Sequence, residues 1–173
     1  MAWYKNFVPD LMIKCYQDLT LSILQQWGCQ VLAVDIDNTL VAYHQAHPDE
    51  GSLDFLKKLQ AAGIEVVLIS NNSKKRVATF CRDLSIRAYA SAKKPLPFLY
   101  RRLLKDLQIE KNQLVCLGDQ LLTDVLGAKL AKVKVIWCEP LTKVDIPVTR
   151  INRVIEKQIY KKLVRKGLLS EKV

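Results

Sequence analysis

Short runs rich in valine and isoleucine alternate along this chain with longer segments of helical periodicity. A run that is apolar at every position is typical of a strand buried on both faces, and helices between such strands indicate a parallel sheet. Right-handed crossovers leave few topologies for such a sheet. The pattern therefore predicts an α/β fold, a Rossmann-like doubly wound parallel sheet of about five strands. The expected strands are Val31–Asp35, Ile64–Ser70, Ala88–Ala90, Leu114–Gly118 and Val133–Trp137, with helices near Ser52–Ala62, Lys74–Leu84, Leu96–Leu107 and Leu121–Leu130.

All the expected strands lie in residues 31–140, which form the predicted core between an N-terminal segment, 1–30, and a C-terminal segment, 141–173. The N-terminal segment is expected to form a helix that packs on the sheet. In the C-terminal segment, apolar residues recur at helical spacing between lysines and arginines, which predicts a basic amphipathic helix. This helix has two open interpretations, docking on the core and binding to an anionic surface. Its apolar residues are Ile151, Val154, Ile155, Ile159, Leu163 and Val164.

The 173 residues include 27 Lys and Arg against 17 Asp and Glu, a net charge of +10. This balance favours polyanionic partners such as phospholipid surfaces or nucleic acid, although a solvated surface explains the charge equally well. Five cysteines without a C-x-x-C pair support neither a zinc site nor a disulfide scaffold. The sequence has no signal-peptide pattern and no long apolar span. We therefore expect a cytoplasmic protein, with peripheral membrane attachment through the basic C-terminal helix as an alternative.

Polar residues follow the expected strands at their carboxyl ends, where doubly wound sheets bind ligands. The first strand leads into Asp35-Ile36-Asp37-Asn38-Thr39, and the second leads into Ser70-Asn71-Asn72. Lys93-Lys94-Pro95 follows the third strand, and Gly118-Asp119 with the later Asp124 follows the fourth. Because the carboxyl ends of parallel strands meet at one edge, these residues are expected to form a single site.

Phosphoryl transfer from a monoester needs a cation, because the phosphate dianion repels an anionic nucleophile. Asp35 and Asp119 are expected to bind Mg²⁺, which prefers oxygen ligands, and Asp35 can then attack phosphorus to form a covalent intermediate. Asp37 can donate a proton to the leaving group and later accept one from water. A turn after the strand would also bring the Asp37 carbonyl to the metal. Thr39, a further candidate phosphate ligand, and Asp124 are expected to position the loop and the metal shell.

The second and third motifs supply groups suited to bind the phosphate. Ser70 can hydrogen-bond a phosphate oxygen. Lys94 or Lys93 can neutralise the phosphoryl group and the nucleophile. Asn71 is interpreted either as a phosphate or substrate contact or as a residue that only makes the turn after the strand.

The four motifs together resemble those of the haloacid dehalogenase-like (HAD) phosphatases in order and spacing. The resemblance implies a HAD-like fold and assigns one role to each motif residue. The implied roles are nucleophile for Asp35, acid and base for Asp37, phosphate binding for Ser70 and Lys94, and metal binding for Asp119.

Three further stretches narrow this resemblance to the subfamily III A, YqeG-like phosphatases. They are Phe-Val-Pro-Asp near the N-terminus, Asp-Asn-Thr-Leu-Val, and Ala-Lys-Lys-Pro, in which Lys94 precedes Pro95 and so fits the third motif better than Lys93. The similarity covers Phe7 to about Pro140. Related members include mitochondrial phosphatidylglycerophosphate phosphatases, which implies a lipid phosphate as a candidate substrate.

The intervals between the motifs have no room for a cap domain. One helix and one strand fill the interval from Asp35 to Ser70, and the same holds from Ser70 to Lys94. The site is therefore expected to be open to solvent. An open site suits a large substrate such as a lipid headgroup, a phosphoprotein or a nucleic-acid end, and it also admits a metabolite.

The favoured function is a Mg²⁺-dependent phosphatase that hydrolyses a phosphate monoester through an aspartyl-phosphate. Phosphatidylglycerophosphate is the candidate substrate, with another phosphorylated metabolite or macromolecule as the alternative. A receiver-like signalling domain would share the acidic residues and the lysine, but Asp37 and the late Gly-Asp…Asp motif suit turnover better. A basic nucleic-acid-binding protein with a vestigial site is the third hypothesis. The expected partner is thus a phosphorylated small molecule or a phospholipid headgroup, with nucleic acid less favoured.

Overall fold

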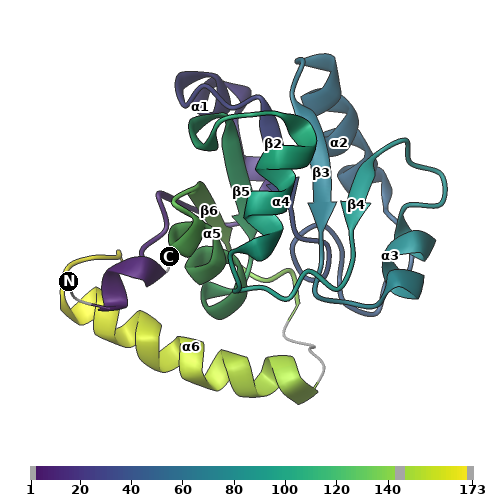
Figure 1. The fold of residues 1–173 in the computed structure, drawn as a ribbon. Coiled ribbons are helices and arrows are strands. Elements are labelled where there is room, and N and C mark those ends of the chain that lie inside the picture. The colour runs from purple at the N-terminus through teal and green to yellow at the C-terminus, as the bar shows by residue number, and fades with distance from the viewer. Residues whose placement is uncertain (1–2, 143–146, 171–173) are drawn as a thin grey trace.

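A parallel sheet of six strands forms the centre of the molecule in the computed structural model, which describes residues 3–142 and 147–170, with the backbone alone for 147–150. The strands lie in the order β1-β6-β5-β2-β3-β4, and every neighbouring pair is parallel (Figure 1). The predicted doubly wound α/β fold is confirmed. The strands are Leu11–Ile13 (β1), Val31–Val34 (β2), Glu65–Ile69 (β3), Arg87–Tyr89 (β4), Leu114–Gly118 (β5) and Lys134–Cys138 (β6).

Helices cover both faces of this sheet, which is why the central strands β2 and β5 have no charged residue. Alternate residues of a strand point to opposite faces. Leu32 and Val34 of β2 pack with α1, α2 and α3, whereas Val31 and Ala33 pack with α4, α5 and α6. The helices are Leu21–Gln26 (α1), Glu50–Ala61 (α2), Lys74–Phe80 (α3), Phe98–Leu107 (α4), Leu126–Ala131 (α5) and Pro147–Arg165 (α6), and the π-helical turn Leu121–Val125 (η4) leads into α5.

The N-terminal segment differs from the single helix that the sequence predicts. From Trp3 onward it forms the turn Trp3–Phe7 (η1), the edge strand β1, the turn Tyr16–Asp18 (η2) and the short helix α1. Strand β1 pairs with β6, and the Asp10 carboxylate beside it accepts a 2.8 Å hydrogen bond from the Val135 amide. A strand of three residues is too short to show a periodicity, so only this distant pairing defines it.

Helix α6 runs along the lower side of the molecule in Figure 1, within the C-terminal segment for which the sequence predicts an amphipathic helix. Ile159 and Leu163, in its second half, are buried against the core. Ile151 and Val154, in its first half, are each 64% exposed. Docking on the core therefore buries only part of the apolar face of α6. Among the described residues, no helix combines the length and hydrophobicity needed to span a bilayer.

Candidate active site

Strand β2 delivers Asp35 to the carboxyl edge of the sheet. The Asp35 amide still donates to the Leu117 carbonyl of β5 at 2.9 Å, so the carboxylate is held in register with the neighbouring strand. The chain then turns, because the Ile36 carbonyl accepts the amide of Leu40 at 3.0 Å and Asn38 has a φ of 63°. Asp35 is buried, with 5% of its surface exposed.

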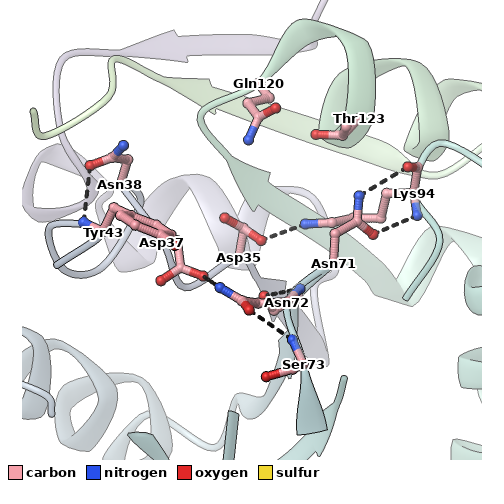
Figure 2. A pocket seen from close by; sticks show the side chains of 11 residues that line it. Asp35, Asp37, Asn38, Tyr43, Asn71, Asn72, Ser73, Lys94, Gln120 and Thr123 are labelled. Carbon is pink, nitrogen blue, oxygen red and sulfur yellow. Dashed lines mark hydrogen bonds and ion pairs between the residues drawn. The ribbon is translucent and has the colours of Figure 1, made fainter. Parts of the chain in front are cut away.

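The turn after β2 sends Asp37 to the wall of the pocket rather than into the sheet. Asp37 Oδ1 pairs with Arg76 Nη2 at 2.8 Å, and its Oδ2 accepts a 3.3 Å hydrogen bond from Asn72 Nδ2 (Figure 2). Arg76 also donates to the carbonyls of Gln45 and Ala46, at 2.7 and 2.8 Å. Arg76, which lies on α3, therefore connects Asp37 to the later part of the loop after β2. The motifs gave no indication of Arg76, because its contact with Asp37 spans 39 residues.

The residues after β3 arrange the far side of the pocket. Ser70 is buried at the pocket wall, and its Oγ accepts the amide of Asn72 at 3.0 Å. The Asn71 side chain binds the backbone of Lys94 twice, accepting from its amide at 2.7 Å and donating to its carbonyl at 3.0 Å. The structure thus gives Asn71 a positioning contact, and its phosphate-binding role stays a prediction.

Lys94 reaches into the centre of the site, whereas Lys93 is exposed. The Lys94 ammonium lies 2.5 Å from Asp35 Oδ1 and 2.6 Å from Asp124 Oδ1. Burial disfavours its charge, but the attraction of Asp124 and Asp35 exceeds this and raises the pKa of Lys94. The lysine therefore stays protonated between two carboxylates.

The loop after β5 brings Asp119 and Asp124 to the same place. A Cβ at Gly118 would lie 2.4 Å from Asp124 Cγ, so only glycine leaves room for Asp124 to fold back over the end of β5. The Asp124 Oδ2 accepts the amide of Gln120 at 3.0 Å, which fixes the loop. Thr39 is fully buried and donates to Asp119 Oδ1 at 3.2 Å or Asp35 Oδ2 at 3.5 Å, so it joins two carboxylates.

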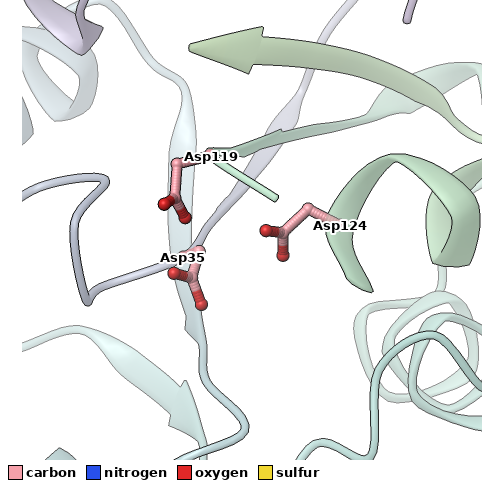
Figure 3. A group of neighbouring side chains, drawn as sticks. All are labelled: Asp35, Asp119 and Asp124. Atoms are coloured by element: carbon pink, nitrogen blue, oxygen red, sulfur yellow. The ribbon is translucent and has the colours of Figure 1, made fainter. Parts of the chain in front are cut away.

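Three buried carboxylates therefore form a cluster at the strand ends. Asp35, Asp119 and Asp124 each offer one oxygen, and these oxygens lie within 4.8 Å of one another (Figure 3). Hard oxygen donors of this kind suit Mg²⁺ and similar cations. The side chain of Asp124 belongs to this cluster and that of Asp37 does not, whereas the sequence assigned Asp124 a supporting role and Asp37 a metal contact through its carbonyl.

Burial and the crowding of like charges raise the pKa values of two carboxylates in the cluster. Burial raises the pKa of Asp35 well above its ordinary value, and Asp124 and Asp119 add to this against the attraction of Lys94. Burial likewise raises the pKa of Asp119 to about 6, against the opposing attraction of Arg153. An added cation would relieve both effects, because it favours the charged form of each carboxylate.

A hollow of about 190 Å³, lined by Asp35 of this cluster, opens to solvent. Figure 2 shows Asp35 and Lys94 at its centre, with Asp37 and Asn72 to one side and Gln120 and Thr123 to the other. In residues 3–142 no further domain lies between the motifs to cover it. The remaining residues that line it are Asn38, Tyr43, Ser70, Asn71 and Ser73.

Helix α6 adds a second contact that the motifs did not indicate. Arg153 Nη1 donates to the Asp119 carbonyl at 3.0 Å and to Glu156 Oε2 at 3.2 Å, and its Nη2 pairs with Asp119 Oδ2. Glu156 accepts the amide of Leu122 at 2.8 Å. Burial raises the pKa of Glu156 to about 7. The C-terminal helix is thus bound to the loop that carries Asp119.

Comparison with known proteins agrees with this geometry. Residues 23–132 match the hydrolase family described as haloacid dehalogenase-like hydrolase. The chain is 32% identical to the probable phosphatase YqeG of Bacillus subtilis, over 94% of this chain and 95% of that protein.

Two solved structures share the fold. An uncharacterised protein from Listeria monocytogenes has a TM-score of 0.54 and 18% identity, over 76% of this chain and 99% of that one. The 3-deoxy-D-manno-octulosonate 8-phosphate phosphatase of Yersinia pestis has a TM-score of 0.51 and 18% identity, over 70% of this chain and 79% of that one.

Proposed function

Since this chain belongs to the haloacid dehalogenase-like hydrolases, we propose that it is a Mg²⁺-dependent phosphatase that works through a phosphorylated Asp35. The membership confirms the resemblance drawn from the four motifs. The observation that carries the proposal is the 2.5 Å contact between Lys94 and Asp35 at the floor of an open hollow. A buried carboxylate beside a fixed cation can approach a phosphate dianion, because the cation offsets the repulsion between them.

In the first half of the reaction, an Asp35 oxygen attacks phosphorus. The bond from phosphorus to the ester oxygen breaks as the new bond forms, and the departing oxygen takes a proton from Asp37. Lys94 faces Asp35 and Asp124, and Ser70 lies at the pocket wall, so both are available to bind phosphate oxygens. Asn71 holds the backbone of Lys94, and Thr39 holds Asp35 and Asp119.

In the second half, water attacks phosphorus from the open side of the hollow. Asp37 accepts the proton that the water loses, and the bond between phosphorus and Asp35 breaks to release inorganic phosphate. Arg76 and Asn72 hold Asp37 beside the pocket throughout. One carboxylate thus serves as acid and then as base, as a double displacement requires.

The residues that would hold the metal are Asp35, Asp119 and Asp124, with the Asp37 carbonyl as a further candidate. The cluster fits a divalent cation, because it gathers three buried carboxylates, two of which contact the buried Lys94 ammonium. When bound, Mg²⁺ supplies charge neutralisation for the nucleophile and the phosphate.

For the substrate we propose phosphatidylglycerophosphate, with another phosphorylated metabolite or macromolecule as the alternative. An open hollow accepts a headgroup that remains at a lipid surface. A separate groove of about 420 Å³ adjoins α6, with apolar walls from Leu121, Trp137 and Tyr160 and with Lys157 and Lys161 beside them. The exposed Ile151 and Val154 and the basic residues of α6 suit an anionic membrane surface.

Phosphate release from an aryl phosphate tests the proposed activity. We expect release with Mg²⁺, little release in EDTA, and little release from Asp35→Asn. Activity that survives both EDTA and the substitution would contradict the proposal. Phosphatidylglycerophosphate in anionic micelles then tests the substrate. A protein that fails on this lipid but hydrolyses members of a panel of small phosphate esters would contradict the lipid assignment alone.

A further inference from the structure

Arg153, on α6, contacts the acidic cluster, although no motif marks it. Its guanidinium contacts Asp119 twice, at the backbone carbonyl and at Oδ2, and it contacts Glu156 of its own helix. Asp119 is fully buried, whereas the Arg153 side chain is 21% exposed. The contact therefore joins a surface helix to the interior of the site.

The two carboxylate oxygens of Asp119 have different neighbours. Oδ1 lies 3.2 Å from the Thr39 hydroxyl, which is 3.5 Å from Asp35 Oδ2, so Thr39 links Oδ1 to Asp35. Oδ2 pairs with Arg153. The guanidinium thus touches one oxygen of a carboxylate that belongs to the group of candidate metal ligands.

The charge balance of the cluster determines how the contact between Arg153 and Asp119 affects the binding of a divalent cation. The Lys94 ammonium contacts Asp35 and Asp124, and Arg153 pairs with Asp119, so the three carboxylates, when ionised, carry more negative charge than Lys94 alone can balance. Arg153 offsets part of that excess from outside. A cation at this position stabilises the metal-free site, and it repels a divalent cation that enters the cluster.

We propose that Arg153 sets the metal affinity of the site by opposing the binding of a divalent cation at Asp119. The inference depends on the proposed function only in taking Asp119 as a metal ligand. Linkage adds a reciprocal effect: a cation bound at the cluster weakens the hold of Asp119 on Arg153, and therefore on α6, by the same factor.

Calorimetric titration of the metal-free protein with Mg²⁺ alone, without substrate, tests this inference. We expect Arg153→Ala to bind Mg²⁺ about tenfold more tightly than the wild type, because one repelling charge near a dication is lost. The metal-free variant should also melt at a lower temperature, and Mg²⁺ should narrow the difference. Arg153→Gln, which loses the charge but keeps hydrogen-bonding capacity, should shift the affinity in the same direction.

Two further variants distinguish the effect on Mg²⁺ affinity of the charge at position 153 from that of a charge elsewhere on α6. Arg153→Lys retains the cation and should keep the affinity near that of the wild type. Arg165→Ala removes an exposed charge from the same helix, outside the groove beside α6, and should leave the affinity unchanged.

If Arg153→Ala or Arg153→Gln binds Mg²⁺ no more tightly than the wild type does, the inference is overturned. Equal affinity would mean that Arg153 has no effect on metal binding, and weaker affinity would mean that Arg153 aligns Asp119 for the metal. If the wild type binds no divalent cation at all, the proposed metal site fails, and this inference fails with it. The two failures are therefore distinguishable.

Discussion

Lys94 is the side chain on which the proposed chemistry depends most. Its side chain is 2% exposed and lies between the carboxylates of Asp35 and Asp124, each within 2.6 Å. Removing one partner of a buried ion pair leaves uncompensated charge, which is much more costly than losing a surface pair. Stability and activity should therefore both depend on this one ammonium.

Lys94→Met should lower the free energy of unfolding by about 3–5 kcal/mol, because Asp35 and Asp124 lose their buried counter-charge. Phosphate release should fall about 10²–10³-fold, as when a preorganised donor is removed from an active site. Urea unfolding and the aryl phosphate assay measure the two effects. Lys93→Met is the matched control, because Lys93 is exposed, and it should change stability by less than about 0.5 kcal/mol. Similar losses in both variants would contradict the assignment of Lys94.

Arg76→Ala should reduce phosphate release by about 10–100-fold, because Asp37 loses the guanidinium that holds it beside the pocket. Arg76→Lys should restore only part of the activity, since an ammonium cannot reproduce the guanidinium's contacts with Asp37, Gln45 and Ala46 together. Steady-state kinetics measures both variants, with Lys75→Ala, an exposed neighbour on α3, as the control. Full activity in Arg76→Ala would show that Asp37 needs no such support.

The contrast between the predicted residues and the two arginines shows what a sequence can disclose about this site. Asp35 and Asp119 could be predicted because each follows an apolar strand, and parallel strands end at one edge. Arg76 and Arg153 contact the site across 39 and 34 residues, from helices whose periodicity says nothing of which residue faces the strand ends. Only the packing of those helices brings the two guanidinium groups to the carboxylates.

At the scale of elements, α6 is the part whose environment the sequence left most open. Its apolar spacing predicted a helix, and both docking and surface binding fitted that pattern. The docked half contains Leu163, which is fully buried, and the polar contact of Glu156 with the amide of Leu122. Strand β1 was missed for a related reason, since its three residues are defined by pairing with β6 and by no local pattern.

Glu156 should make the stability of the metal-free protein depend on pH. Burial raises its pKa from an ordinary 4.5 to about 7, so the folded protein binds this proton more tightly than the unfolded chain. The free energy of unfolding should therefore fall as pH rises between about 4.5 and about 7. In Glu156→Gln this part of the fall should disappear, while the part due to Asp119, whose pKa is raised to about 6, should remain.

Urea unfolding in EDTA at pH values across that range measures the effect of Glu156. The variant should show a shallower loss of stability toward neutral pH than the wild type. Equal slopes for the two proteins would mean that Glu156 is ionised in the folded state at all these pH values, contrary to its buried position.

In the whole molecule, the sheet, the open hollow and the basic helix α6 meet at the carboxylate cluster. The strands deliver the carboxylates, no inserted domain covers them within residues 3–142, and α6 contacts the loop of Asp119. This arrangement explains how a protein of one core can present its chemistry to a large substrate. The other assigned roles all serve the covalent step at Asp35, so the proposed mechanism depends on that step.

Acid quenching during turnover of a substrate with a labelled phosphate group would trap a phosphorylated Asp35. With a labelled aryl phosphate, whose leaving group departs with little need of an acid, Asp37→Asn should accumulate labelled protein, because the second half of the reaction lacks its base. The label should lie on the peptide that contains Asp35 and should be released by hydroxylamine, as an acyl phosphate is. Asp35→Asn should carry no label. Labelled phosphate released by the wild type, with no label at Asp35 in the Asp37→Asn variant or with label at another residue, would contradict the mechanism.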